Sequence, residues 1–188
     1  MEKLLLHICC APCSVACIRQ LREEMGIEPV GFWYNPNIHP LTEYRARRDT
    51  LIRYADQIAL KLIVREEYGL LPFTQAVCGR EDNRCAYCYE SRFEETARYA
   101  AAHGFEAFTT TLTVSPYQNH PLIFEIAGRC AEKHGVQYLP IDFSPRFRSG
   151  QAEARELGLY MQKYCGCVYS EAERYAKEIE KDRLKFIE

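Results

Sequence analysis

A short apolar run that ends in a cysteine-rich turn opens the sequence, KLLLHICCAPCS at residues 3–14. Apolar side chains then recur at helical spacing before Gly26, at Val15, Ile18, Leu21 and Met25. A run of this length followed by that period is typical of a buried strand leading into an amphipathic helix. The stretch therefore predicts a strand over Lys3–Ile8, a loop of cysteines and a helix.

The same order of strand, loop and helix repeats along the chain. Further strands are predicted at Pro29–Tyr34, Leu62–Val64, Ala107–Thr111 and Gln137–Pro140. Further helices are predicted at Tyr44–Leu60 with Thr42 as its N-cap, at Cys85–His103, at Pro121–His134, and after a capping box of Ser170 and Glu173. Strands that alternate with helices predict an α/β fold, a single Rossmann-like domain over residues 1–188 with a mainly parallel sheet flanked by helices.

Length and composition agree with one domain and an intracellular protein. The chain has 188 residues, of which 47% are hydrophobic, enough for one sizeable core. No stretch approaches the roughly 18 apolar residues of a membrane span, and the N-terminus shows no signal-peptide pattern. We therefore expect a cytoplasmic location.

Charge gives no global sign of a nucleic-acid partner, because the net charge is −2. An RNA partner would need a local basic patch. Three clusters qualify, each of which is ordinarily a solvated face: Arg45, Arg47 and Arg48; Arg80 and Arg84; Arg146 and Arg148.

Ten cysteines are the most informative feature of the composition. In a reducing compartment, so many thiols indicate metal binding or redox chemistry. Seven of them fall into three groups: Cys9, Cys10 and Cys13; Cys85 and Cys88; Cys165 and Cys167. Cys17 and Cys130 lie inside helical patterns, where free cysteines pack as small hydrophobes, and Cys78 has no partner at ligand spacing.

Chemistry-bearing residues follow the predicted strands, where parallel sheets carry their sites. They are Cys9 and Cys10 after the first strand, Asn35 after the second, Thr110 and Thr111 at the fourth, and Asp142 after the fifth. We expect one pocket at this edge, with a metal site built from these loops and the Cys165–Cys167 loop.

Three kinds of cysteine site are open. Structural zinc normally uses two C-x-x-C or similar knuckles, whereas here an adjacent pair and a C-x-C accompany one clear C-x-x-C. Cys10-Ala11-Pro12-Cys13 has the form of a thioredoxin-like redox turn, but the extra cysteines fit that reading poorly. Thiolates from distant segments favour an iron–sulfur cluster.

Several ordered motifs resemble the QueH family of epoxyqueuosine reductases. They are LLHICCAPCS at residues 5–14, YNPNIHP at 34–40, RCAYC at 84–88, FTTTL at 108–112, SPYQN at 115–119 and QKYCGC at 162–167. The resemblance implies reductive removal of the epoxide oxygen of epoxyqueuosine in tRNA, the last step of queuosine formation. It also implies a nucleotide-hydrolase-like fold. A Ser-Gly-Gly loop is missing after the first strand, so ATP use is not expected.

The resemblance also implies roles for the cysteines. Cys9, Cys10, Cys85 and Cys88 would hold a [4Fe–4S] cluster, with Cys13 as a substitute ligand. Cys165 and Cys167 would be a redox-active pair able to form a disulfide bond, or ligands of an additional iron ion. The electron donor is not identified by the sequence.

Further residues are expected around the substrate. Proton donors would come from Asp142, Tyr164 and His39. The expected substrate-binding residues are Asn35, His39, Arg47, Thr110, Tyr117 and Gln118, with Asn119 beside the base and Arg45 and Arg48 on phosphates. A cluster-dependent tRNA sulfur-transfer or thiol-redox protein and a zinc-stabilised RNA-binding module are the alternatives.

Overall fold

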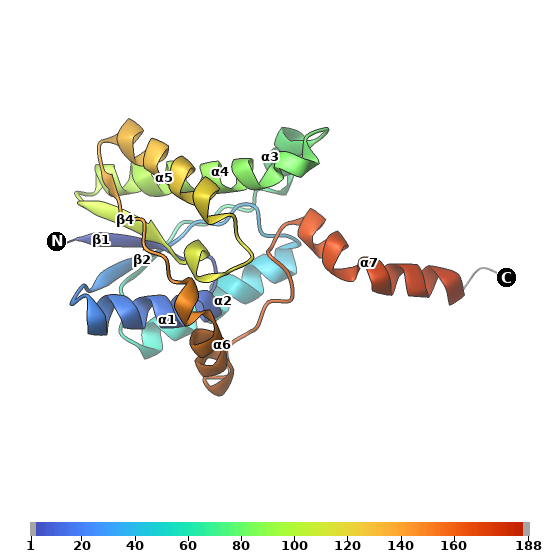
Figure 1. Cartoon of the computed structure of the whole chain (residues 1–188), viewed down its shortest axis with the longest axis horizontal. Coiled ribbons are helices and arrows are strands. Elements are labelled where there is room, and N and C mark those ends of the chain that lie inside the picture. The colour runs from blue at the N-terminus through green and yellow to red at the C-terminus, as the bar shows by residue number, and fades with distance from the viewer. Residues whose placement is uncertain (1–2, 186–188) are drawn as a thin grey trace.

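A five-stranded sheet lies at the centre of the protein, whose computed structural model describes residues 3–185 (Figure 1). The strands are β1 (Leu4–His7), β2 (Pro29–Trp33), β3 (Leu62–Val64), β4 (Ala107–Thr110) and β5 (Gln137–Tyr138). Their order is β3-β2-β1-β4-β5, and every neighbouring pair is parallel. This arrangement confirms the predicted α/β fold with a parallel sheet.

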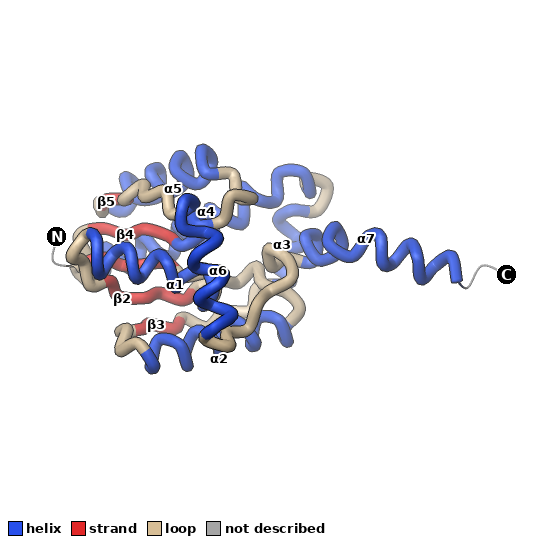
Figure 2. The backbone as a smooth tube through the Cα atoms, turned by 60° about the horizontal axis from the view of Figure 1, so that its bottom comes forward, coloured by secondary structure: helices blue, strands red, loops and turns tan. Residues whose placement is uncertain are grey.

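Helices cover both faces of the sheet, as Figures 1 and 2 show. They are α1 (Ala11–Arg19, continued by a π-helical turn at Gln20–Glu24), α2 (Leu41–Gln57), α3 (Leu70–Val77), α4 (Arg84–Ala102), α5 (His120–His134), α6 (Phe147–Glu156) and α7 (Val168–Lys185). The helices α4 and α5 pack together on one face, and α1 and α2 lie on the other with α6 against α1.

The core is built around β1, whose four side chains are all fully buried. Helices on both sheet faces leave no solvated side, so the strand reads as a continuous apolar run and not as an alternating one. Aromatic side chains complete the core on both faces, among them Phe32, Trp33, Phe93 and Phe108.

Two predicted helix starts are wrong, because other residues begin the helices. Helix α2 starts at Leu41 with Pro40 at its N-cap, so Thr42 lies inside the first turn. Helix α7 starts at Val168, so Ser170 also lies within the helix. The Ser170 hydroxyl donates to the Cys167 carbonyl oxygen at 2.7 Å, and Glu173 pairs with Arg84. No capping box forms between them.

Two helices, α3 and α6, were not predicted from the sequence, and each has a local feature that explains why. Helix α3 is eight residues long and carries Pro72 in its first turn. Helix α6 has Gly150 at its centre, a residue that usually argues against a helix interior. Here a side chain would collide with α1, since a Cβ at Gly150 would lie 2.8 Å from the Ala16 Cβ.

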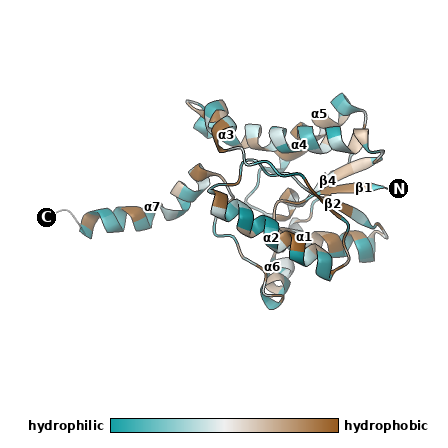
Figure 3. Cartoon of the chain, turned by 180° about the vertical axis from the view of Figure 1, so that it is seen from behind, coloured by the Kyte–Doolittle hydropathy of each residue, from teal (hydrophilic) through white to brown (hydrophobic). Residues whose placement is uncertain are grey.

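The last helix projects from the body of the molecule, as all three views show. None of the α7 side chains is buried, and hydrophilic residues predominate along it in Figure 3. No helix within residues 3–185 combines the length and apolarity needed to cross a membrane.

Candidate functional site

A cavity of about 270 Å³ opens at the carboxyl edge of the sheet. It lies beside the loops after β1 and β4, the two adjacent strands at which the connection order of the sheet reverses. Ligands of open parallel sheets bind at such a switch point. Its lining residues come from five segments: Cys9 and Cys13; Arg47; Thr111, Leu112, Ser115, Tyr117 and Gln118; Phe147 and Gln151; Gln162, Lys163, Tyr164 and Cys165.

Three buried cysteines gather at this cavity, of which Cys9 and Cys13 line it. The Sγ atoms of Cys9, Cys10 and Cys13 all lie within 4.8 Å of one another. Backbone geometry explains how neighbours converge: Cys10 is extended at φ −171°, and α1 begins directly after it. The adjacent Cys9 is fastened to the end of β4, because its N–H donates to the Thr111 hydroxyl at 3.2 Å.

The three thiols differ in acidity. Hydrogen bonds from Cys10 and Cys13 hold the pKa of Cys9 well below its usual range. Burial raises the pKa of Cys10, and hydrogen bonding with Cys10 and Cys9 raises that of Cys13. The lowered pKa favours the thiolate form of Cys9 over that of its two neighbours, and the thiolate is the form of cysteine that binds soft metals.

The other four clustered cysteines form a second group. Burial, followed by the nearby charge of Cys165, raises the pKa of Cys85. Burial likewise raises the pKa of Cys88 to about 12, although the positive charge of Arg92 opposes it. Cys88 and Cys167 are buried, whereas Cys85 and Cys165 are exposed. All ten cysteines lie within residues 3–185 and are free thiols, so the predicted Cys165–Cys167 disulfide is not observed.

Carboxamide side chains donate to a sulfur at three points of the two cysteine groups. Asn37 Nδ2 lies 3.0 Å from Cys88 Sγ, Gln162 Nε2 lies 3.0 Å from Cys10 Sγ, and Gln118 Nε2 lies 3.4 Å from Cys165 Sγ. Asn37 is itself held by Arg92, which donates to its Oδ1 at 2.7 Å. Such N–H···S contacts are the surroundings that cluster-ligating sulfurs use. Sequence reasoning missed Asn37, Arg92 and Gln162, because their role depends on contacts between distant segments.

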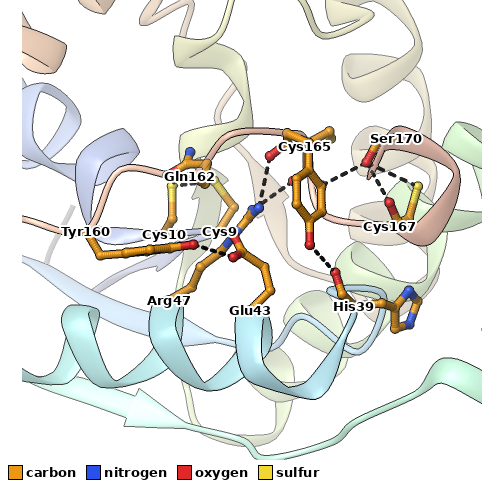
Figure 4. Close-up of polar contacts among 12 residues, drawn as sticks. Cys9, Cys10, His39, Glu43, Arg47, Tyr160, Gln162, Cys165, Cys167 and Ser170 are labelled. Carbon is orange, nitrogen blue, oxygen red and sulfur yellow. Dashed lines mark hydrogen bonds and ion pairs between the residues drawn. The ribbon is translucent and has the colours of Figure 1, made fainter. Parts of the chain in front are cut away.

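Arg47 holds the cysteine loop in place, as Figure 4 shows. This buried guanidinium donates to the carbonyl oxygens of Cys165 at 2.8 Å and Tyr164 at 2.9 Å. It also pairs with Glu43 at 2.7 Å, and Tyr160 hydrogen-bonds the second oxygen of that carboxylate. The predicted role of Arg47 as a substrate ligand remains untested; its observed contacts are with the protein.

The three predicted proton donors lie in different places. Tyr164 lines the cavity, and its hydroxyl donates to the His39 carbonyl oxygen at 2.6 Å. The His39 ring is fully buried between Tyr68 and Phe73, outside the cavity lining, and burial lowers its pKa to about 4. Asp142 is exposed and accepts a hydrogen bond from the Ser144 N–H at 2.9 Å, and it is not one of the residues that line the cavity.

Asn35 and Thr110 lie buried beneath the site. Asn35 Nδ2 donates to the Ile8 carbonyl oxygen at 2.9 Å, and Thr110 Oγ1 lies 2.9 Å from His7 Nδ1. Burial lowers the pKa of His7 to about 4, so this imidazole is neutral at pH 7. These contacts join the ends of β1, β2 and β4, and neither Asn35 nor Thr110 lines the cavity.

The predicted base and phosphate ligands are spread around the cavity. Tyr117 is 85% exposed at its mouth, and Gln118 lines it while accepting from the Tyr89 hydroxyl at 2.7 Å. Asn119 caps α5 instead, since its side chain accepts from the Leu122 N–H. Arg45 is exposed on α2, and Arg48 pairs with Asp49 and Glu66.

Comparison with known proteins gives a family match over most of the chain. The family model "Epoxyqueuosine reductase QueH" matches residues 4–173. The epoxyqueuosine reductase QueH of Dehalococcoides mccartyi is 37% identical over 93% of this chain and 96% of its own length. That of Thermotoga maritima is 36% identical over 98% of both chains. Among solved structures, the U34-tRNA thiolase NcsA of Methanococcus maripaludis with its [4Fe–4S] cluster has a TM-score of 0.60 at 13% identity, covering 96% of this chain and 66% of NcsA, a similarity of fold.

Proposed function

Because this chain belongs to the epoxyqueuosine reductase QueH family and is thus an oxidoreductase, we propose that it reduces epoxyqueuosine in tRNA with an iron–sulfur cluster at the switch-point cavity. The reaction removes the epoxide oxygen as water and consumes two electrons and two protons. The observation that carries the proposal is the gathering of cysteines from separate segments around one cavity at the carboxyl edge of the sheet.

The donor set fits a [4Fe–4S] cluster. Its members are soft sulfur ligands, and carboxamides donate to the sulfurs of Cys10, Cys88 and Cys165. We propose Cys9, Cys10, Cys85 and Cys88 as the ligands, with Cys13 as the alternative at the first position. When bound, the cluster supplies single electrons at low potential.

Two electrons require a second redox group or two rounds of single-electron transfer. We propose that Cys165 and Cys167 serve here, as a dithiol pair or as ligands of an additional iron ion. Cys165 supports this role because it is exposed and lines the cavity, whereas Cys167 lies behind it near Ser170. The source of electrons is an external donor that the residues do not identify.

Tyr164 is the best placed of the predicted proton donors. It lines the cavity, and burial raises the pKa of its phenol well above neutrality, so the hydroxyl stays protonated at pH 7. Its hydrogen bond to His39 fixes the ring beside Cys165. Asp142 and His39 have no comparable position, because neither lines the cavity. A cytoplasmic location would agree with a tRNA substrate.

The first experiment is the visible spectrum, with iron and sulfide analysis, of anaerobically purified protein. We expect a brown protein with about four irons and four sulfides per chain. That protein, supplied with a strong chemical reductant, should convert epoxyqueuosine to queuosine in an anticodon stem-loop RNA. A colourless protein with stoichiometric zinc after anaerobic handling would overturn the proposal and favour a zinc-stabilised RNA-binding module.

A further inference from the structure

We propose that the side of the cavity formed by Tyr117, Phe147, Gln151 and Lys163 is a nucleotide subsite, which takes an unstacked nucleobase together with its phosphate. The inference rests on the proposed function and assigns the recognition half of the same cavity. Its carrying observation is that these four side chains line a cavity that cysteines also line.

Two aromatic rings form the stacking part of this subsite. Tyr117 is 85% exposed, and its ring lies 6.0 Å from that of Phe147 at an interplanar angle of 86°. An edge-on pair leaves a ring face open at the mouth of the cavity. Unpaired bases bind such faces, because every base has a π surface that stacks on aromatic side chains.

Gln151 supplies the polar edge of the subsite. It follows Phe147 by four residues on α6, which places both side chains on the same face of the helix. Within residues 3–185 its carboxamide has no hydrogen-bond partner, in contrast to Gln118 and Gln162 of the same cavity, which are bound to cysteine sulfurs. A free carboxamide offers both a donor and an acceptor to the edge of a base.

Lys163 supplies the charge. Its side chain is exposed, lines the cavity and forms no ion pair within the described part of the chain. Its neighbours are fixed, since Gln162 contacts Cys10 and Tyr164 contacts His39. Arg47 also lines the cavity but is committed to Glu43 and two loop carbonyls, so Lys163 is the cation available for a phosphate.

Helix α6 is packed tightly enough to act as a fixed wall. Gly150 lies between Phe147 and Gln151 and brings the helix into contact with Ala16 of α1. Arg19 of α1 also forms an ion pair with Glu153. Helix α1 begins directly after Cys10 and carries Cys13. The same helix therefore positions these cysteine sulfurs and, through its contacts with α6, the side of the cavity that carries Phe147 and Gln151. A base held on the wall therefore meets the cysteine side of the cavity.

The test measures binding and turnover separately, with the anaerobic holoenzyme and a dye-labelled anticodon stem-loop RNA carrying epoxyqueuosine. Phe147→Ala should raise Kd and KM by roughly 5- to 150-fold, the loss typical of one base–aromatic contact. Phe147→Tyr, which keeps the ring, should bind like the wild type. Gln151→Ala should raise KM for the modified RNA, with the cluster absorbance unchanged.

Salt dependence isolates the phosphate contact. Lys163→Met should reduce the slope of log Kd against log salt by about 0.7, the value for one phosphate contact on a single strand. Lys61→Met is the matched control, because Lys61 is exposed, directly precedes β3 at the opposite edge of the sheet and does not line the cavity. The control should keep the wild-type slope.

Outcomes for the subsite and for the proposed reaction are distinguishable. Wild-type turnover with unchanged Kd and KM in Phe147→Ala and Gln151→Ala would overturn the subsite while leaving the reductase function intact. Absence of wild-type turnover, together with the expected losses of RNA binding, would support the subsite and overturn the reaction. An equal change of salt slope in Lys163→Met and Lys61→Met would overturn the phosphate contact.

Discussion

Arg47 on α2 donates from Nη1 to the carbonyl oxygen of Cys165 at 2.8 Å, and so ties a helix on one sheet face to the cysteine loop. The side chain that carries this guanidinium is only 2% exposed and forms an ion pair with Glu43. A charge buried to this degree is stable because its N–H groups are satisfied by a carboxylate and two carbonyls. The position of the cysteine loop therefore depends on a residue 118 positions earlier in the chain.

Replacement of Arg47 should loosen this loop. Arg47→Met would leave the Glu43 carboxylate buried without its partner and should lower the free energy of unfolding by on the order of 3–5 kcal/mol. Arg47→Lys keeps the charge but loses the planar fork, so it should cost less stability yet still reduce activity. Denaturant unfolding and reductase assays measure the two effects.

Arg53→Lys provides the control for this pair of variants, because Arg53 is exposed on the same helix. It should leave stability and activity unchanged. Full activity in Arg47→Lys would show that the bidentate contact to the loop is dispensable.

Gly166, between Cys165 and Cys167, should not tolerate a side chain. Its φ of 151° is rarely adopted by other residues, and a Cβ there would lie 3.2 Å from Ile38 Cγ1 and 3.4 Å from Arg47 Nη1. Gly166→Ala should cost about 1–3 kcal/mol of stability and reduce activity more than Gly128→Ala. Gly128 lies in α5 with nothing within 4 Å, so alanine there should stabilise the helix by roughly 0.5–1 kcal/mol. Thermal unfolding measures the stability of both variants. Equal melting temperatures for Gly166→Ala and Gly128→Ala would show that a side chain is tolerated at Gly166.

Serine substitutions should separate the metal-binding cysteines from the packing cysteines. Cys9→Ser, Cys10→Ser, Cys85→Ser and Cys88→Ser should each lower the iron content of anaerobically purified protein, because a hydroxyl is a poor ligand for this soft site. Cys130→Ala should keep full iron content, since Cys130 is buried on α5 outside the cavity. Unchanged iron in Cys10→Ser together with loss in Cys13→Ser would transfer the ligand role to Cys13.

Acid should destabilise the fold through two buried histidines. Burial lowers the pKa of His7 and of His39 from 6.5 to about 4. Above pH 6.5 each histidine is neutral in both the folded and the unfolded chain. Between pH 6.5 and 4 each histidine binds a proton in the unfolded chain but stays neutral in the folded chain. Stability is therefore lost as the pH falls, with a slope of up to about 1.4 kcal/mol per pH unit for each histidine.

Urea unfolding between pH 7.5 and 4.5 measures this slope. His39→Phe should reduce it, because the ring lies among aromatic side chains and neither nitrogen has a hydrogen-bond partner among the described residues. The exposed His103 gives the control, and His103→Phe should keep the wild-type slope. An unchanged slope in His39→Phe would contradict the contribution of His39.

The sequence by itself determined the fold class, the three cysteine groups and the family. The apolar run at residues 3–8, the glycines that directly follow the predicted helices 85–103 and 121–134 (Gly104 and Gly135), and the alternating elements are local signals. They allow β1, α4, α5 and the parallel sheet to be predicted. The family follows from ordered motifs, which the family model and curated relatives match.

Only the tertiary structure decided which side chains meet. It brings the sulfurs of Cys9, Cys10 and Cys13 within 4.8 Å, directs Arg47 to the Cys165 loop and places the unpredicted α6 along the cavity. Gly150 opposes a helix by propensity, yet its lack of a side chain permits the contact with Ala16 that holds α6 in place. The physical reason is common to all three: close packing between distant segments outweighs local preference, and a single sequence records only the local part.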